Sequence, residues 1–201
     1  MFGNIKLGGG VTARHIKNKL GWRWQIRNRL RPAYWLGWLA VRAAIAFSRL
    51  TGIPTLTSSV SIAVHRWNGD WEYLGIVGYR MVTTAFAEFM VDQLQTETSV
   101  WGDFKFHDSG TGVTAEASAD VALVTKVESG RSTGTQTEST STAYRSVGTI
   151  AYTGTRAITE HGLFSAASSV TLLDRTLFSA VNVVNGDSIE FTYTLTVTAG
   201  G

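Results

Sequence analysis

The 201-residue chain contains no cysteine, which excludes disulfides, thiolate nucleophiles and thiolate metal sites. It has 18 basic and 15 acidic residues, but the two signs are separated along the sequence. Residues 1–66 contain eleven basic residues and no acidic one, whereas residues 67–201 carry a net charge of −8. This division predicts a basic N-terminal segment that needs an acidic partner and an acidic body that faces water.

Residues 1–57 predict a basic, tryptophan-rich helical arm. The helical spacing of its apolar side chains indicates a first helix over Val11–Arg31. A proline suited to the first helical turn then precedes a second helix, which is expected over Ala33–Leu50. The second helix is apolar almost all round, and Arg42 and Arg49, seven residues apart, mark its one polar edge. Such a helix must be buried against the body, a neighbouring subunit, a partner protein or a membrane surface.

Neither a secretory signal peptide nor a transmembrane helix is expected. The apolar run of residues 33–47 begins late and follows a long charged segment, which is not typical of a signal sequence. Residues 32–51 are numerous enough to cross about 30 Å of hydrocarbon. However, Arg42 lies at the centre of this run, where an arginine costs about 2.5–3.5 kcal/mol on insertion scales.

Residues 58–78 predict a β-hairpin. Apolar residues alternate with polar ones before Asn68-Gly69, a dipeptide typical of a two-residue type I′ turn. The register that this turn implies pairs Val64 with Tyr73, Ile62 with Gly75 and Val60 with Val77.

A short amphipathic helix is predicted for residues 83–95, with its apolar stripe against the body. The remainder, which is rich in threonine, serine, glycine and valine, favours strands and turns. The predicted strands are Val100–Phe106, Ala122–Glu128, Ala143–Thr153, Ala157–Ser165, Leu172–Val184 and Ser188–Thr198. Asn185-Gly186 indicates a hairpin between the last two of these strands.

These elements predict a mainly β fold. We expect residues 58–201 to form an antiparallel β-sandwich or a body like a jelly roll, with strands over residues 99–198 and the single short helix. The basic helical arm precedes this body.

The sequence contains none of the common enzyme motifs, such as a Walker loop, a dinucleotide fingerprint, a nucleophile elbow or HExxH. We therefore expect no catalytic residue, no cofactor and no metal site. The histidines, which we interpret as hydrogen-bonded or exposed side chains without a ligand role, are His15, His65, His107 and His161.

Three groups of charged residues in the body have alternative interpretations. The stretch Asp108–Gly112 offers oxygens for calcium, but it lacks the EF-hand spacing, so we interpret it as a solvated turn. Asp174-Arg175 is expected to be a charge pair on the surface or at a sheet edge. A catalytic acid commonly acts with a second carboxylate, and the sequence shows no such partner for Glu160. We therefore assign Glu160 no catalytic role.

Tryptophans are interleaved with the basic residues of the arm, and this pattern fits three kinds of partner. Basic and aromatic side chains can bind nucleic acid through phosphates and stacked bases. They can also lie in a membrane interface, or hold an acidic protein surface through arginine forks and tryptophan anchors. The simplest alternative is a solvated helix face. The candidate partner-binding residues are Arg14, Lys17, Lys19, Trp22, Arg23, Trp24, Arg27, Arg29, Arg31, Trp35, Trp38, Arg42 and Arg49.

The C-terminal half contains several motifs of one recognisable type. They are Phe106–Gly112, Thr114–Ala117, Ile158–Phe164, Leu172–Phe178 and Val183–Ile189 leading into residues 191–193. Over about residues 99–201 the chain resembles small β-rich virion structural proteins of tailed bacteriophages, of the head decoration or cement type or of the neck or fibre type. The motifs belong to turns and core strands, and nothing familiar covers residues 1–60.

The resemblance implies a non-enzymatic phage virion structural protein, and we expect a capsid decoration or cement protein whose arm attaches it to neighbouring capsid subunits. The alternatives are a neck or tail connector, a fibre-base protein, and a virion protein whose basic arm binds nucleic acid. The expected partners are the major capsid protein or other virion proteins, with a homotrimer favoured by analogy. Binding to nucleic acid or to a membrane is the less favoured alternative. The expected location is the virion, assembled in the host cytoplasm.

Overall fold

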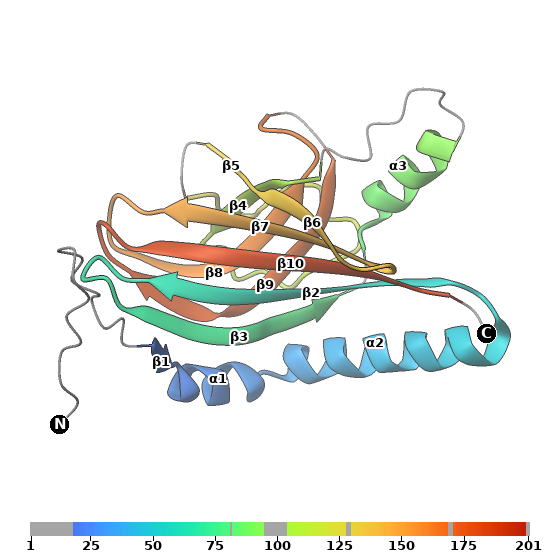
Figure 1. Ribbon diagram of the computed structural model, residues 1–201, viewed down its shortest axis with the longest axis horizontal. Helices are drawn as coiled ribbons and strands as arrows, with labels where there is room; N and C mark the ends of the chain where they lie inside the picture. The colour runs from blue at the N-terminus through green and yellow to red at the C-terminus, as the bar shows by residue number, and fades with distance from the viewer. Residues whose placement is uncertain (1–17, 81, 95–103, 128–129, 169–170, 200–201) are drawn as a thin grey trace, which may run out of the picture.

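The computed structural model describes residues 18–80, 82–94, 104–127, 130–168 and 171–199. Within them the chain forms ten strands and three helices, which confirms the prediction of a mainly β chain. The strands form two sheets, and all neighbouring strands run antiparallel except the short β1 beside β3 (Figure 1).

The larger sheet has six strands in the described residues. In spatial order they are β1 (Asn18–Leu20), β3 (Trp71–Arg80), β2 (Thr55–His65), β10 (Ser188–Thr198), β7 (Ala143–Ala151) and β6 (Thr135–Thr140). The smaller sheet contains β5 (Ser132–Thr133), β4 (Phe106–Gly110), β8 (Arg156–Phe164) and β9 (Leu172–Val183).

Both sheets contribute to one buried core. Alternate residues of β10, namely Ile189, Phe191 and Tyr193, are completely buried, as strand periodicity predicts. The ring of Phe191 stacks on His161 of β8 with centroids 4.4 Å apart, and it lies 6.3 Å from the ring of Phe178 in β9. Strand β10 of one sheet therefore packs directly on two strands of the other.

The β2–β3 hairpin is present, but the predicted two-residue turn at its tip is wrong. The Gly69 amide donates to the Arg66 carbonyl at 2.8 Å, and the Arg66 amide donates to the Asp70 carbonyl at 2.8 Å. Gly69 has a φ of 87°, so it is the left-handed residue of a three-residue loop with a bulge. The Asn68 side chain accepts the Asp70 amide at 3.0 Å, which stabilises this wider loop.

The wider loop changes the hairpin register. The observed pairs are His65 with Trp71, Val64 with Glu72, Ala63 with Tyr73, Ile62 with Gly75 and Val60 with Gly78. Of the predicted pairs, Ile62 with Gly75 is confirmed. The others are wrong because irregularities between residues 60 and 63 shift the register on both sides of that pair.

Asn185-Gly186 forms a turn but not a hairpin tip. Strand β9 lies in the smaller sheet and β10 in the larger one, so the turn carries the chain between sheets. Gly186 adopts a φ of 88°, and the Asp187 carboxylate accepts the Val184 amide at 3.1 Å. The sequence predicts the turn correctly, but the pairing of the flanking strands depends on contacts far along the chain.

Four of the predicted strands are confirmed as β7, β8, β9 and β10, with bounds within about two residues. The predicted strand Ala122–Glu128 is wrong over its described part, where Lys126 makes one isolated bridge to Gly110. Most of the predicted strand Val100–Phe106 lies outside the described residues, and β4 begins at its last residue. Strands β5 and β6 were not predicted, because their polar sequences lack an apolar alternation.

Helix α3 (Thr84–Leu94) corresponds to the predicted short helix, whereas the predicted first helix differs. Helix α1 spans Trp22–Arg29, and residues 18–20 form β1 instead; residues 11–17 lie outside the described part. Helix α2 spans Pro32–Thr51 and ends at Gly52, whose φ is 75°. Helices α1 and α2 follow one another along the β3 side of the larger sheet, and α3 lies at a different corner (Figure 1).

Candidate functional site

Helix α1 attaches the N-terminal segment to the body at a corner where β3 of one sheet lies close to β9 of the other. Asn28 is 1% exposed, and its side-chain nitrogen donates to the Val77 carbonyl of β3 at 2.8 Å. Its side-chain oxygen accepts the Ser179 amide of β9 at 2.9 Å. One buried amide side chain therefore connects backbone groups of strands that belong to different sheets.

Helix α1 also covers part of the free edge of β9, the last strand of the smaller sheet. The indole nitrogen of Trp24 donates to the Ala180 carbonyl at 3.0 Å, and the Arg27 guanidinium donates to the same oxygen at 2.7 Å. An uncovered strand edge presents unpaired backbone groups that invite association with other chains. Trp24, Arg27 and Asn28 therefore attach α1 to the body.

Replacement of Asn28 by alanine is expected to lower the free energy of unfolding by about 2–4 kcal/mol, because it leaves two backbone groups beneath α1 without a partner. Urea unfolding of the full chain measures this value. The matched control is Gln25→Ala, since Gln25 lies on the same helix and its side chain donates one long, exposed hydrogen bond of 3.4 Å to the Tyr73 carbonyl. Equal effects of the two substitutions would contradict the role assigned to Asn28.

Helix α2 lies close to β3 at its N-terminal half and to β10 at its C-terminal half. The rings of Tyr34 and Tyr79 meet edge to face with centroids 5.7 Å apart. A Cβ at Gly37 would overlap the Tyr79 carbonyl, so glycine permits this close approach. Further along, the Ser48 hydroxyl donates to the Thr198 carbonyl at 3.3 Å, and Ser48 is completely buried.

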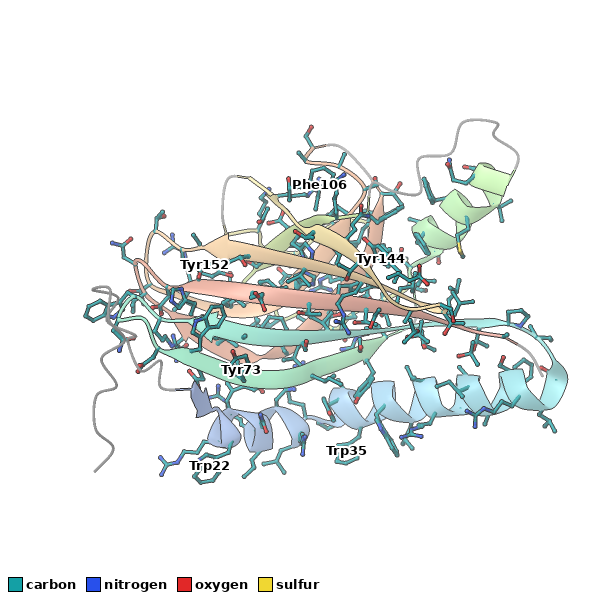
Figure 2. The ribbon with its side chains drawn as sticks, viewed as in Figure 1. Trp22, Trp35, Tyr73, Phe106, Tyr144 and Tyr152 are labelled. Carbon is teal, nitrogen blue, oxygen red and sulfur yellow. The ribbon has the colours of Figure 1, made fainter. Side chains whose placement is uncertain are left out.

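The opposite side of α1 and α2 is apolar and exposed. We call it the outer helical surface. Its members are the apolar residues Trp22, Ile26, Leu30, Trp35, Leu36, Leu39, Phe47 and Leu50 and the arginines Arg23, Arg29, Arg42 and Arg49. The apolar members are between 49% and 87% exposed, and Figure 2 shows Trp22 and Trp35 on the side of the helices away from the sheets. Contiguous exposed apolar side chains of this size are typical of interaction surfaces.

The four arginines of the outer helical surface form no ion pair with any carboxylate of the described residues. Two of them lie over tryptophan rings instead: Arg23 is 5.3 Å from the centroid of Trp22, and Arg42 is 5.2 Å from that of Trp38. No acidic residue precedes Asp70 in the sequence. The surface therefore combines apolar area with positive charge that no carboxylate in the described part of the chain neutralises.

The structure places the candidate partner-binding residues differently from one another. Arg14 and Lys17 lie outside the described residues, and Lys19 belongs to β1. Trp24 and Arg27 face the body, as shown above. Arg31, in the linker between the helices, is half-buried; burial lowers its pKa, and the nearby Glu116 partly opposes that shift. Trp22, Arg23, Arg29, Trp35, Trp38, Arg42 and Arg49 remain on or beside the outer helical surface.

Apart from the outer helical surface, a network of buried polar side chains lies inside the body. Glu160 of β8 is completely buried, and its carboxylate accepts the amides of Gly112 at 3.0 Å, Val124 at 3.2 Å and Thr125 at 2.8 Å. It also accepts the Arg175 guanidinium of β9 at 2.7 Å. Burial alone would raise the pKa of Glu160, but these four donors outweigh it and hold the pKa below its ordinary value.

The hydrogen bonds of Glu160 and Arg175 hold residues 111–127 against the smaller sheet. The Arg175 guanidinium also donates to the Asp120 carboxylate and to the Thr114 carbonyl, each at 3.0 Å. Glu160 captures the Val124 and Thr125 amides, which a strand would use for pairing. The predicted strand over Ala122–Glu128 is therefore replaced by a loop that one carboxylate organises.

Two interpretations of charged residues from the sequence need correction. Asp174 and Arg175 lie in β9, the edge strand of the smaller sheet, as one of the two predicted placements had it, but each is only 3% exposed. Within the described residues Arg175 pairs with Glu160 and Asp120 rather than with Asp174. Asp108 does not lie in a solvated turn; it is 2% exposed in β4 and pairs with Lys126 at 3.1 Å. Charged side chains are seldom buried without partners, so sequence reasoning places them on the surface unless the partners are known.

His107 and His161, which lie 54 residues apart, form a buried pair. The Nδ1 atom of His107 is 2.9 Å from Nε2 of His161, and Nε2 of His107 is 2.9 Å from the Ser146 hydroxyl. A serine beside a histidine is one element of nucleophilic catalysis. Here each of the three residues is at most 1% exposed, so this serine is closed to a substrate. The cluster links β4 and β8 of the smaller sheet to β7 of the larger one.

A pocket of about 440 Å³ opens beside α2. It lies between α2, the end of β3 and the loop of residues 115–118. Its lining includes Ala33, Leu36, Gly37, Ala40, Arg80 and Glu116. Arg80 and Glu116 form an ion pair in its wall. In the described part of the chain, no three histidine or acidic residues are arranged to hold a metal ion.

None of the helices in the described residues is both long and apolar enough to cross a membrane. Comparison of the chain with models of protein families found no match. Searches of curated proteins and of solved structures also found no similar protein. The geometry of the outer helical surface therefore provides the main basis for a functional assignment.

Proposed function

We propose that this chain is a non-enzymatic structural protein of a phage virion, and that it decorates the capsid. In this proposal the outer helical surface attaches the chain to neighbouring virion proteins, and the two sheets form the layers of a β-sandwich body. The motifs of the C-terminal half support the virion assignment through their resemblance to phage structural proteins. A homotrimer stays a prediction, which the mass of the chain in solution tests.

The observation that carries the proposal is the composition of the outer helical surface. Its eight large apolar side chains remain exposed although α1 and α2 are packed on the body through their other side. Burial of each such side chain is worth about 1.5–3 kcal/mol, so a partner that covers several of them gains substantial affinity. The unneutralised arginines add attraction and orientation toward an acidic protein surface.

A protein partner accounts for this composition better than nucleic acid does. Phosphates attract arginine, but a nucleic acid offers little that would bury Ile26, Leu30, Leu39 or Leu50, which lie among the arginines. Nucleic acid binding would also make affinity fall steeply with salt, by about 0.9 log units per log unit of salt for each phosphate neutralised. A weak salt response of the chain on duplex DNA is therefore expected.

The substitution Leu39→Glu tests the attachment. Leu39 lies in the middle of the outer helical surface and is 53% exposed, so the change leaves the core intact. In particles of the source phage that carry this substitution, the number of copies of the chain per particle is expected to fall at least tenfold, because a buried unpaired carboxylate costs several kcal/mol at an interface. Quantitative gel densitometry or mass spectrometry of purified particles measures the copies.

The matched control is Val91→Glu, on the exposed face of α3 with a similar exposure of 56%. This variant is expected to occupy particles at the level of the unaltered chain. Equal occupancy by Leu39→Glu would contradict attachment through the outer helical surface. Absence of the unaltered chain from particles would contradict the virion assignment itself.

A further inference from the structure

Five exposed apolar residues of α2 follow a heptad pattern. Leu36, Leu39, Ala43, Ala46 and Leu50 succeed one another at alternating intervals of three and four residues, and all are exposed. Alternating intervals of three and four place apolar residues in one seam along a helix, which is the pattern of the a and d positions of coiled coils. This seam is separate from the residues of α2 that face the body, such as Tyr34 and Ser48.

The residues on the two sides of the seam differ in charge. Trp35, Arg42 and Arg49 recur every seven residues on one side, which corresponds to the g positions, and Ala40 and Phe47 occupy the e positions on the other side. Acidic or basic residues at e and g positions select the partner of a coiled coil through interhelical ion pairs. With arginine at these g positions, the complementary partner carries acidic residues beside its own apolar seam.

We propose that the seam of α2 binds a single amphipathic α-helix of a partner protein, with apolar residues at its a and d positions and acidic residues at its flanks. This inference rests on the proposed function, since it specifies the partner of the same surface. The seam from Leu36 to Leu50 is about 21 Å long at 1.5 Å per residue, which corresponds to about four helical turns. Alanines at the centre of the seam permit a close approach of the two helix axes.

The pocket beside α2 supports a helical occupant. Leu36 belongs to both the seam and the pocket lining, and Ala40 of the e flank lines the same pocket. A large side chain on the partner helix can therefore enter the pocket while its neighbours pack on the seam. The pocket lies at the N-terminal end of the seam, and a side chain buried in such a pocket is typical of residues that dominate binding energy.

A second copy of α2 fits the seam poorly. If two copies packed antiparallel, the g positions would face each other, and Arg42 and Arg49 would lie against the arginines of the other copy. In a parallel arrangement the g positions would face Phe47 and residue 54, so both arginines would stay without a carboxylate. The partner helix is therefore expected to belong to a different segment with acidic flanks.

Binding of designed peptides to the full chain tests this inference. The probe is a 21-residue peptide with leucine at a and d and glutamate at e and g. One comparison peptide carries lysine in place of glutamate, and another is a scrambled sequence of the acidic composition. The acidic heptad peptide is expected to bind at least about tenfold more tightly than either, as measured by calorimetry at physiological salt. Equal binding of the scrambled peptide would overturn the inference, because charge alone would then explain it.

The double substitution Arg42→Glu and Arg49→Glu gives a readout that does not depend on stability. Both residues are exposed on α2, and this variant is expected to prefer the lysine peptide over the acidic one. An unchanged preference would overturn the assignment of these positions as flanks. Leu39→Glu is expected to lower the affinity for the acidic peptide at least about tenfold, and Val91→Glu is expected to leave it unchanged.

The measurements also distinguish two other possible partners of the seam, a membrane surface and a second copy of the chain. Binding to vesicles that contain an anionic phospholipid, without binding to the acidic peptide, would overturn the inference in favour of a membrane surface. Self-association that Leu39→Glu abolishes would overturn it in favour of a second copy. Failure of the proposed function is distinguishable, since peptide binding can persist even if the chain is absent from particles. Conversely, loss of occupancy in Leu39→Glu particles without peptide binding would show that the partner is not a helix of this type.

Discussion

Replacement of Glu160 by alanine is expected to lower the free energy of unfolding by about 3–5 kcal/mol, because it leaves three backbone amides without their acceptor and removes one of the two carboxylates that pair with the buried Arg175. Arg175 is only 3% exposed, so solvent cannot replace the lost carboxylate at low cost. A loss of this size is a large part of the stability of a domain, which is commonly about 5–15 kcal/mol. Urea unfolding of the purified chain measures it.

The conservative substitution Glu160→Gln separates charge from hydrogen bonding. Glutamine retains an acceptor for part of the amide set but removes one of the two carboxylates that pair with Arg175, the other being Asp120, so an intermediate loss is expected. Hydrogen exchange is expected to accelerate at Gly112, Val124 and Thr125, whose amides Glu160 accepts. The control is Glu88→Ala on the exposed face of α3. A loss below about 1 kcal/mol for Glu160→Ala would contradict its organising role.

The histidine pair is expected to make the fold sensitive to acid. Burial lowers the pKa of His107 from 6.5 to about 4, and burial together with His107 lowers the pKa of His161 well below 6.5. At pH values between 6.5 and the lowered pKa, the unfolded chain binds protons that the folded chain does not. The free energy of unfolding therefore falls as the pH drops through this range. His107 alone accounts for a loss of about 2.4 kcal/mol between pH 7 and pH 4.5.

Asp174 acts in the opposite direction over part of the same range. Burial raises its pKa from 3.8 to about 6, although the hydroxyls of Ser58 and Thr176 and the charge of Arg80 oppose the shift. The folded chain therefore binds a proton before the unfolded chain does, and this contributes stability as the pH falls below about 6. The gain is about 2 kcal/mol at pH 4.5, which offsets much of the loss from His107.

These opposing contributions are separated by comparing unfolding free energies at pH 7 and pH 4.5. His107→Gln is expected to reduce the loss on acidification by about 2.4 kcal/mol, and Asp174→Asn is expected to increase it by about 2 kcal/mol. The comparison is between two pH values of one variant, so an overall destabilisation does not affect the conclusion. An identical pH dependence of both variants and the unaltered chain would contradict the assigned protonation states.

Local patterns predict elements of this chain well where one side of a strand is buried. The alternation predicts β10 over Ser188–Thr198, and the strand spans these residues, because four of its alternate residues, from Ile189 to Leu195, enter the core. Alternation does not encode pairing partners, however. Strand β10 pairs with β2 and β7, and the Asn185-Gly186 turn that precedes it joins two sheets rather than two paired strands.

The buried polar residues could not be located from the sequence for a related reason. His107 and His161 become neighbours only through the pairing of β4 with β8, and Glu160 meets Arg175 through the pairing of β8 with β9. Burial of each group is tolerable only because the partner is present. A sequence pattern read one segment at a time contains no information about that partner.

The second helix is an intermediate case. Its apolar composition predicts that it must be covered, and the structure identifies the side that the body covers through Tyr34, Gly37 and Ser48. The composition could not distinguish that side from the seam of Leu36, Leu39 and Leu50, since both are apolar. Only the packed structure separates the residues that stabilise the fold from those that remain available to a partner.

A density map of the particle to which we propose that the chain belongs tests the central claim most directly, since that claim concerns what contacts the outer helical surface. We predict that density of a neighbouring protein covers the seam of α2 from Leu36 to Leu50, and that carboxylates lie beside Arg42 and Arg49. A map in which this surface faces solvent, while another face of the chain makes the contact with the particle, would contradict the account.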